Sequence, residues 1–435
     1  MWNPARRSVS RWPLARHLVR RGPSGGLGEI AVDITTEIPT SYRALFTIPG
    51  FPRLVGSMML ARTASTMVSL VLVLFALERY HSPGLAGLVT FLAIFPGLMV
   101  SPIAGALLDR HGRTRLMALD YGVAATALTL IAVLGASDAL TEWLLVVIVT
   151  AQSLTFPLSH TGVRTMFPLL VPRPLWERAN AIDSNGYVVS SIFGPAIAGA
   201  LVATVGSIWT LALTAAMYVV AAAVTLGLRD PLGRVPHGAL LSDAWDGLVY
   251  VAKHPTLRGL AISVSTNNIA NGLFFIGLPV LVLTRLGGGP AQVGQLFALS
   301  GITAAISVLF FGRFGTEGRE RPLMAGSMLV IGLGYLLTLL SPSMLFAAVA
   351  LLIVGLATGP FDIVLFTMRQ RRTDPAWLGR AFAVSMSLNF VGFPVGSGLG
   401  GAIVPLSIEL ALGLAVTLNV VAAVITFLTV PAQHS

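Results

Sequence analysis

Cysteine is absent from this chain of 435 residues, and charged side chains are scarce. The lack of cysteine excludes disulfides and thiolate metal sites. The seven histidines show no spacing typical of metal ligands, so we expect no metal and no cofactor. Only 11% of the residues are Asp, Glu, Lys or Arg, against about 25% in an ordinary soluble domain. With 55% of the residues hydrophobic, the composition indicates that lipid surrounds most of the chain.

Negative charge is also scarce, and the formal net charge is +10. Almost all of the 28 basic residues are arginine, since Lys253 is the only lysine. A basic chain can bind nucleic acid or an anionic membrane surface. The positions of the arginines follow the predicted spans, which favours the lipid bilayer as partner and excludes nucleic acid. Residues 1–53 form a basic tail without the long apolar run of a cleavable signal peptide, and we expect this tail to be cytoplasmic.

Apolar runs long enough to cross a bilayer, about 20 residues each, occur twelve times. The weakest division lies between the fifth and sixth runs, where only Val205 and Gly206 intervene. The predicted fold class is therefore an all-α membrane protein with twelve transmembrane helices in two six-helix bundles. The spans are 54–78, 84–108, 115–135, 142–163, 179–204, 207–228, 259–284, 291–312, 322–341, 343–367, 379–404 and 408–430.

The basic residues give an independent test of this layout. If both termini are cytoplasmic, 25 of the 28 basic residues fall in cytoplasmic segments, Arg164 in the loop between spans 4 and 5 among them. Only Arg79 and Arg285 fall outside, and Arg62 lies within a span. This is the distribution that the positive-inside rule describes. It predicts a multi-pass protein of the bacterial cytoplasmic (inner) membrane with both termini in the cytoplasm.

The halves of the chain repeat. Arg164 and Arg178 follow span 4 as Arg369 and Arg380 follow span 10, at an offset of 202 to 205 residues. Repeated halves of six spans place a solute pathway between them, near the middle of the membrane. The predicted domains are the tail 1–53, a bundle 54–229, a cytoplasmic linker with a surface helix 230–257, a bundle 258–430 and a cytoplasmic tail 431–435.

The strongest local motif lies between spans 2 and 3. It reads Gly105-Ala-Leu-Leu-Asp109-Arg110-His-Gly112-Arg113-Thr-Arg115. This resembles the loop signature of the major facilitator superfamily, G-xxx-D-R-x-G-R followed by a basic residue, and the chain resembles that superfamily from about Leu54 to Val430. The neighbouring sequence is similar to bacterial efflux-type members.

The resemblance implies that this motif is a gating latch that stabilises the outward-open state. Physically, Gly105 lets two helices approach closely and Gly112 can adopt a positive φ. Asp109 is placed to meet the positive end of a helix from the other half, and Arg113 can pair with carboxylates at cytoplasmic helix ends. The alternative is ordinary loop charge.

Span 5 carries a second motif, Ser190-Ser-Ile-Phe-Gly194-Pro195-Ala-Ile-Ala198-Gly199. It resembles the antiporter signature G-xxx-G-P-xx-G-G, with Ser190 and Ala198 where the family has glycine. In the family this signature accompanies export. Small residues also serve general helix packing, which is the alternative interpretation.

Charged residues inside spans are costly and therefore usually functional or paired. Arg62 lies near the middle of span 1, and we expect it to contact a solute or a carboxylate, the alternative being a structural pair. Asp362 and Asp183 are our candidates for the group that carries the coupling proton. The alternative is pairing with loop arginines, which we prefer for Asp120.

Polar side chains at membrane depth are the remaining candidates for solute binding, although asparagine also joins helices through hydrogen bonds. Asn267 and Asn271 are four residues apart and therefore share one face of span 7. Three aromatic residues are candidates to line an apolar pocket, and the alternative for them is ordinary helix packing. The polar candidates are Gln152, Asn267, Asn268, Asn271 and Asn389, and the aromatic ones are Phe156, Tyr187 and Phe274.

These observations favour a secondary transporter that exports a small amphipathic or drug-like solute by alternating access, with protons as the coupling ion. The alternative is symport uptake of a sugar or another metabolite. An enzyme is disfavoured, because no loop is large enough for a catalytic domain and His160 and Ser159 are sequence neighbours that do not face each other on a helix. No Gly-rich phosphate loop is present. The family habit implies a monomer.

Overall fold

The structure is a computed structural model that describes residues 41–230, 240–374 and 377–432, and these residues fold into helices without a β-strand. Most of the predicted basic tail, part of the linker and the last three residues lie outside the described residues. The helices are α1 (Tyr42–Phe46), α2 (Phe51–Tyr80), α3 (Pro83–Leu92), α4 (Phe95–His111), α5 (Arg113–Ala136), α6 (Glu142–Ser153), α7 (Phe156–Leu170), η2 (Arg173–Leu175), α8 (Trp176–Leu226), α9 (Leu240–Lys253), α10 (Pro255–Thr284), α11 (Pro290–Phe311), α12 (Glu320–Leu339), α13 (Met344–Arg371), α14 (Leu378–Ile403) and α15 (Ile408–Thr429).

Ten helical segments in the described part of the chain are long and apolar enough to cross a membrane. The fifth and sixth predicted spans form one of these segments, because α8 runs through both of them. Gly206 divides α8 with a non-helical backbone (φ 83°, ψ 165°), a conformation that glycine adopts without steric cost. The eleventh predicted span coincides with α14, which is not among the ten.

Two of the spans are each built from two shorter helices. The second span consists of α3 and α4, and the fourth consists of α6 and α7. Pro96 and Pro157 lie in the first turns of α4 and α7, where proline lacks the N–H that would continue the preceding helix. The breaks therefore follow from the sequence and bend the helices that carry the candidate site.

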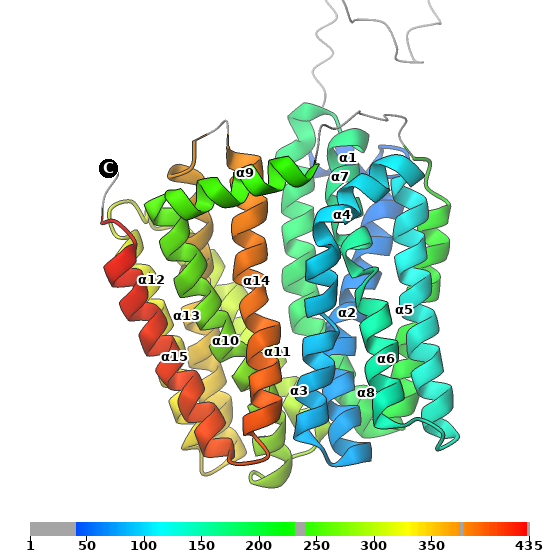
Figure 1. Ribbon diagram of the computed structural model, residues 1–435, viewed down its shortest axis with the longest axis vertical. Helices are drawn as coiled ribbons and strands as arrows, with labels where there is room; N and C mark the ends of the chain where they lie inside the picture. Colours follow the sequence, from blue (N-terminus) through cyan, green and yellow to red (C-terminus); the bar gives the residue numbers. More distant parts are fainter. Residues whose placement is uncertain (1–40, 231–239, 375–376, 433–435) are drawn as a thin grey trace, which may run out of the picture. The chain divides into compact units, whose positions relative to one another are not determined.

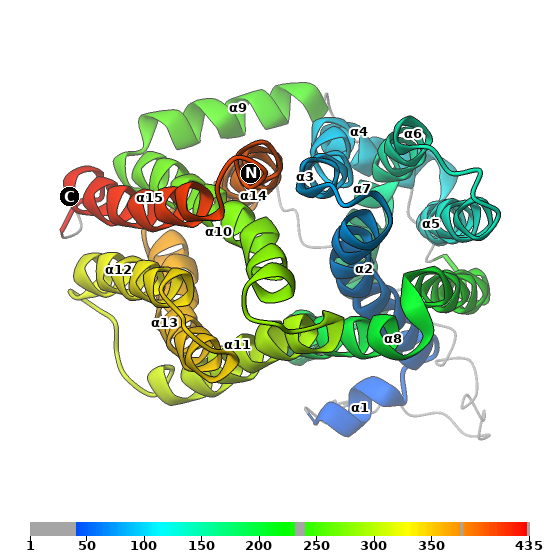
Figure 2. The same ribbon diagram turned by 90° about the horizontal axis from the view of Figure 1, so that it is seen from below.

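The helices pack as two sets, which we call the amino-terminal half (α2–α8) and the carboxy-terminal half (α10–α15) (Figure 2). In the first set α8 packs along α2 and α5, and in the second α10 packs along α14 and α15. The first span of each half thus lies against the fifth, the same arrangement twice. This agrees with the sequence repeat between the halves.

The halves contact each other through α3 with α14 and α8 with α11. Both contacts are made by glycines. A Cβ atom built on Gly401 would lie 2.8 Å from the Cα of Gly87, and one built on Gly199 would lie 2.9 Å from the Cα of Gly294. All four glycines lie near the end of the protein where α2 meets α3, which we call the α3 end (bottom of Figure 1). Backbone therefore touches backbone at this end.

Helix α9 runs across the opposite end, which we call the α9 end (top of Figure 1). It packs on α10, α14 and α4. Tyr250 stacks on Trp377 with ring centroids 4.9 Å apart, and Val251 is buried against Leu257. Trp245 is exposed. This is the amphipathic helix that the sequence predicts within the linker, and it connects parts of both halves.

Candidate functional site

A buried ion pair joins α2 to α8 inside the amino-terminal half. Nη2 of Arg62 lies 2.6 Å from Oδ1 of Asp183, and Nη1 donates to the Asp183 backbone oxygen at 2.8 Å. The Arg62 Cζ also lies 3.7 Å from the ring centroid of Tyr187, one turn further along α8. Arg62 therefore has a carboxylate partner, which fits both the expected carboxylate contact and the alternative of a structural pair. Both side chains are largely buried, with exposed fractions of 9% and 14%.

A small polar cavity lies beside Arg62. Its volume is about 30 Å³, which accommodates on the order of two water molecules and is far below the size of a drug-like solute. The cavity is therefore suited to water within the half. It is lined by Met58, Ala61, Arg62, Ser65, Asp120, Tyr121, Ala124, Gln152, Phe156, Ser159, His160, Val163 and Tyr218.

Asp120 faces this cavity, and its position corrects the expectation that it pairs with loop arginines. Its carboxylate accepts a hydrogen bond of 2.7 Å from Oγ1 of Thr155, at the break between α6 and α7. Among the described residues it forms no ion pair. With span 3 predicted to begin at residue 115, Asp120 was expected only about one turn inside the span. Because α5 begins at Arg113, the residue lies about two turns inside the helix and within the core of the half.

The motif in span 5 contacts two different partners. On one side of α8, Oγ1 of Thr66 donates to the Ser190 backbone oxygen at 2.9 Å, and a Cβ on Gly194 would lie 2.8 Å from Cβ of Thr66. On the other side, Pro195 and Gly199 face Gly294 of α11. Ser190 and Gly194 therefore fix α2 within the half, whereas Pro195 and Gly199 face the other half.

The motif at residues 105–115 connects α4 to α5. Gly112 has φ +94°, as predicted, and a Cβ on it would lie 2.8 Å from Oδ2 of Asp230. Arg113 is buried, whereas Arg110 and Arg115 are exposed. Gly105 and Asp109 belong to α4, and the surroundings of the Asp109 side chain lie outside the described contacts.

In the carboxy-terminal half, the predicted polar residues separate into two groups. Asn389 is engaged inside the protein, because its side-chain oxygen accepts from Nη2 of Arg369 at 2.6 Å and its backbone oxygen accepts from Asn268. Asn267 is buried with its Oδ1 unbonded within the described part of the chain, and Asn271 is exposed. Asn389 is therefore a structural residue in this conformation.

Asp362 lies within α13, about two turns before Arg369. It forms no hydrogen bond or ion pair with a described residue, and it is partly buried. The two candidate carboxylates thus differ, because Asp183 is held by an arginine and Asp362 is not.

One residue of the site was misplaced by the sequence interpretation. Arg164 was expected in the loop after span 4, but α7 continues to Leu170 and keeps it inside the helix. Its Cζ lies 5.7 Å from the ring centroid of Tyr187. The spacing of Phe156, His160 and Arg164, four residues each, predicts one helical face and could have revealed this position.

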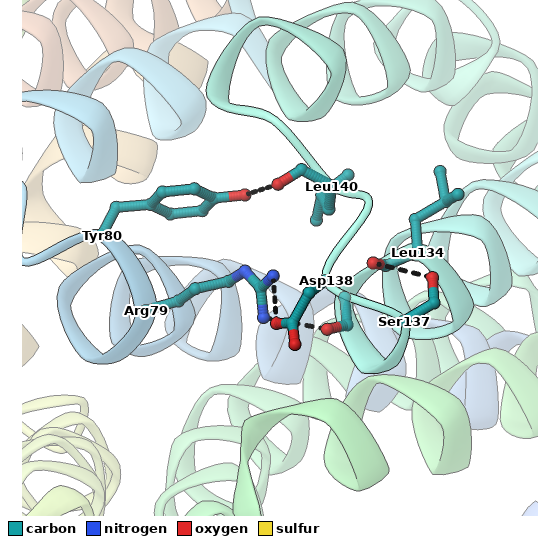
Figure 3. Close-up of polar contacts among 7 residues, drawn as sticks. Arg79, Tyr80, Leu134, Ser137, Asp138 and Leu140 are labelled. Carbon is teal, nitrogen blue, oxygen red and sulfur yellow. Dashed lines mark hydrogen bonds and ion pairs between the residues drawn. The ribbon is translucent and has the colours of Figure 1, made fainter.

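The two arginines predicted to lie outside are each bound within their own half. Nη2 of Arg79 lies 3.0 Å from Asp138 Oδ1, and Nη1 donates to the backbone oxygen of Gly135 (Figure 3). In the carboxy-terminal half, Arg285 pairs with Glu409 of the same half. The pairs of Arg62 with Asp183, Arg79 with Asp138, Arg285 with Glu409 and Glu320 with Arg371 and Arg372 each join two residues of the same half.

Long apolar helices, two similarly packed halves and a charged site between spans define a multi-pass membrane transporter. The chain belongs to the transmembrane secretion effector family of the major facilitator superfamily, which matches residues 48–435.

The relatives agree with this assignment. The chain is 37% identical over 395 residues to an uncharacterised major-facilitator-type transporter y4rN of Sinorhizobium fredii, covering 90% of this chain and 97% of the relative. It is 25% identical to the multidrug efflux pump Tap of Mycolicibacterium fortuitum, covering 73% and 80%. It is 28% identical to the enterobactin exporter EntS of Escherichia coli O139:H28, covering 76% and 79%.

Solved structures show the same fold. The nucleoside transporter NupG superposes with a TM-score of 0.70 at 14% identity, covering 86% of this chain and 98% of that chain. A bacterial homologue of the lysosomal transporter Spinster, in an inward-facing and unoccupied conformation, gives 0.69 at 16% identity, covering 87% and 95%. At these identities the likeness concerns the fold alone.

Proposed function

We propose that this protein exports a small amphipathic solute by alternating access and that protons drive the cycle. The observation that carries the proposal is the Arg62–Asp183 ion pair between α2 and α8. A buried carboxylate that holds an arginine can exchange that partner for a proton, and this exchange would loosen α2 from α8. Export is supported by the relatives named as efflux pumps and exporters and by the motif in span 5.

The arginine distribution supports an orientation with the α9 end in the cytoplasm and the α3 end in the periplasm. In that orientation the glycine contacts of α3 with α14 and α8 with α11 close the periplasmic end. The protein would then be in a cytoplasm-facing state of the bacterial inner membrane, functioning as a monomer with the pathway between its halves.

Asp362 is the second proposed proton carrier. An unpaired carboxylate within a membrane helix is costly when charged, and a bound proton removes that cost. We propose that Asp183 and Asp362, one in each half, are protonated at different stages of the cycle. Gln152, Asn267 and Asn271 are the polar residues we retain as candidate solute contacts.

The test is accumulation of a panel of fluorescent and antibiotic compounds in efflux-deficient cells, with and without a protonophore. We expect the wild type to lower accumulation of at least one compound, with the protonophore restoring it. Asp183→Asn and Asp362→Asn should each weaken export, and Asp138→Asn is the matched control because Asp138 is exposed outside the spans. Unchanged proton-driven export in the double variant would contradict the assigned carriers. No change with any compound would contradict export.

A further inference from the structure

Arg164 is a charged side chain within a membrane helix that the proposed proton cycle does not use. It lies six residues, or about 9 Å along the axis, before the end of α7, and it is exposed. Charged residues at such positions are costly and usually bind a ligand, an ion or another side chain. The question is therefore which group meets this guanidinium.

No carboxylate of the described residues contacts the guanidinium of Arg164. Arg164 forms no hydrogen bond or ion pair with them, and its recorded contact is the ring of Tyr187 at 5.7 Å. Arg62, on the same ring at 3.7 Å, is held by Asp183. One of the two arginines at Tyr187 is thus neutralised and the other keeps its charge and its donors available.

The repeat between the halves provides a second comparison for Arg164. Arg369 occupies the position of Arg164 in the second half, 205 residues later. Arg369 is fully buried, and its Nη2 is 2.6 Å from the side-chain oxygen of Asn389. The same position thus holds a structural arginine in one half and an exposed one in the other. The two halves therefore use this repeat position differently.

Aromatic surface continues from Arg164 along α7. His160 and Phe156 lie one and two turns away on the same face, with ring centroids 4.1 Å apart, and His160 lies 6.4 Å from Tyr187. Both also line the polar cavity beside Arg62. The surface is therefore cationic at one end and aromatic along its length. A guanidinium binds a carboxylate or sulfonate through two parallel hydrogen bonds, and aromatic faces stack on an aromatic ligand.

We propose that Arg164, supported by Tyr187, recognises the acidic group of the transported solute, which is accordingly an aromatic anion rather than a lipophilic cation. Phe156 and His160 contact the apolar part of the same molecule. The proposal rests on the proposed transport function for its physiological meaning, but binding itself requires no proton gradient.

The test is equilibrium binding to the purified full-length protein in detergent, followed by fluorescence anisotropy at about pH 8. The probes are fluorescein, an anion at this pH, and rhodamine 123, a cation with the same xanthene and phenyl framework. We expect fluorescein to bind at least about tenfold more tightly, equivalent to about 1.4 kcal/mol. Arg164→Gln should abolish this preference, whereas Arg164→Lys, which keeps the charge, should retain part of it.

Two further variants separate recognition from folding. Tyr187→Leu should weaken fluorescein binding without changing that of rhodamine 123. Arg173→Gln, which removes an exposed arginine beyond α7, should change neither. Equal affinity of the wild type for the two dyes, or an equal loss of both in Arg164→Gln, would overturn the proposal and leave Arg164 as an arginine that anchors the membrane end of α7. Because no gradient is present, failure of proton-driven export would leave this result standing.

Discussion

Gly199 of α8 and Gly294 of α11 are packed so closely that a Cβ atom on either would lie within 3.0 Å of the other's Cα. Gly87 and Gly401 make the equivalent contact between α3 and α14. Side chains at these positions would have to push the backbones apart. The close approach of the halves at the α3 end therefore depends on glycine at all four positions.

We expect Gly294→Val to favour the state in which the α3 end is open. The absence of native cysteine allows a direct measurement with Ala298→Cys, because Ala298 is buried one turn along α11 from Gly294, between Gly294 and Gly301, which both face α8. A membrane-impermeant maleimide added outside should label this cysteine slowly in the otherwise wild-type protein and several-fold faster with Gly294→Val. Gly413→Val is the control, since a Cβ there meets open space. Equal labelling rates in all backgrounds would contradict the role of the glycine contact.

The Arg62–Asp183 pair should show strong coupling in stability. Removing one partner of a buried pair leaves an uncompensated charge and costs about 3–5 kcal/mol. Arg62→Met should therefore destabilise the protein markedly, and adding Asp183→Asn to Arg62→Met should restore part of the loss. The measurement is the midpoint of thermal unfolding in detergent for the wild type, both single variants and the double variant. Additive losses would show that the two residues act independently.

Gly112 should be intolerant of any side chain. Its φ of +94° costs other residues about 1–3 kcal/mol, and a Cβ would also crowd the carboxylate of Asp230. Gly112→Ala should lower the free energy of unfolding by that amount, whereas Gly122→Ala, in helical α5 with open space around it, should not. If Asp230→Ala fully rescues Gly112→Ala, crowding and not backbone strain is the cause.

Arg79 and Asp138 should contribute unequally although they form one pair (Figure 3). The Asp138 side chain is 91% exposed, and exposed ion pairs contribute about 0–1 kcal/mol. Arg79 also donates to the Gly135 backbone oxygen at the end of α5. Arg79→Ala should therefore lower the unfolding midpoint more than Asp138→Asn. A larger effect of Asp138→Asn would indicate that its charge, and not the bond to the helix end, holds the two helices together.

Helical membrane spans were predictable because length and hydropathy decide them in lipid. The residues at which these helices end were less predictable. The predicted end of span 4 at residue 163 left Arg164 in a loop, although α7 continues for two turns beyond it. An arginine near the membrane surface fits either position, so hydropathy alone does not locate the last turns of a helix.

The candidate site was predictable in its residues but not in its pairs. The sequence indicated a solute or carboxylate contact for Arg62, and the same half carries two aspartates within its spans, Asp183 and Asp120. Which of them meets Arg62 depends on how α8 and α5 rotate about their axes against α2. That rotation is set by small residues such as Gly194, whose contact with Thr66 draws α8 close to α2. A single sequence does not carry this information.

Because the Arg62–Asp183, Arg79–Asp138 and Arg285–Glu409 pairs each stay within one half, separating the halves at the α3 end leaves these salt bridges intact. What is lost there is dispersion contact between glycine backbones, which falls away within about 1 Å and is not screened by ions. Opening should then be abrupt with distance and nearly independent of ionic strength. A transporter that closes in this way would cycle at a similar rate at low and at high salt concentration.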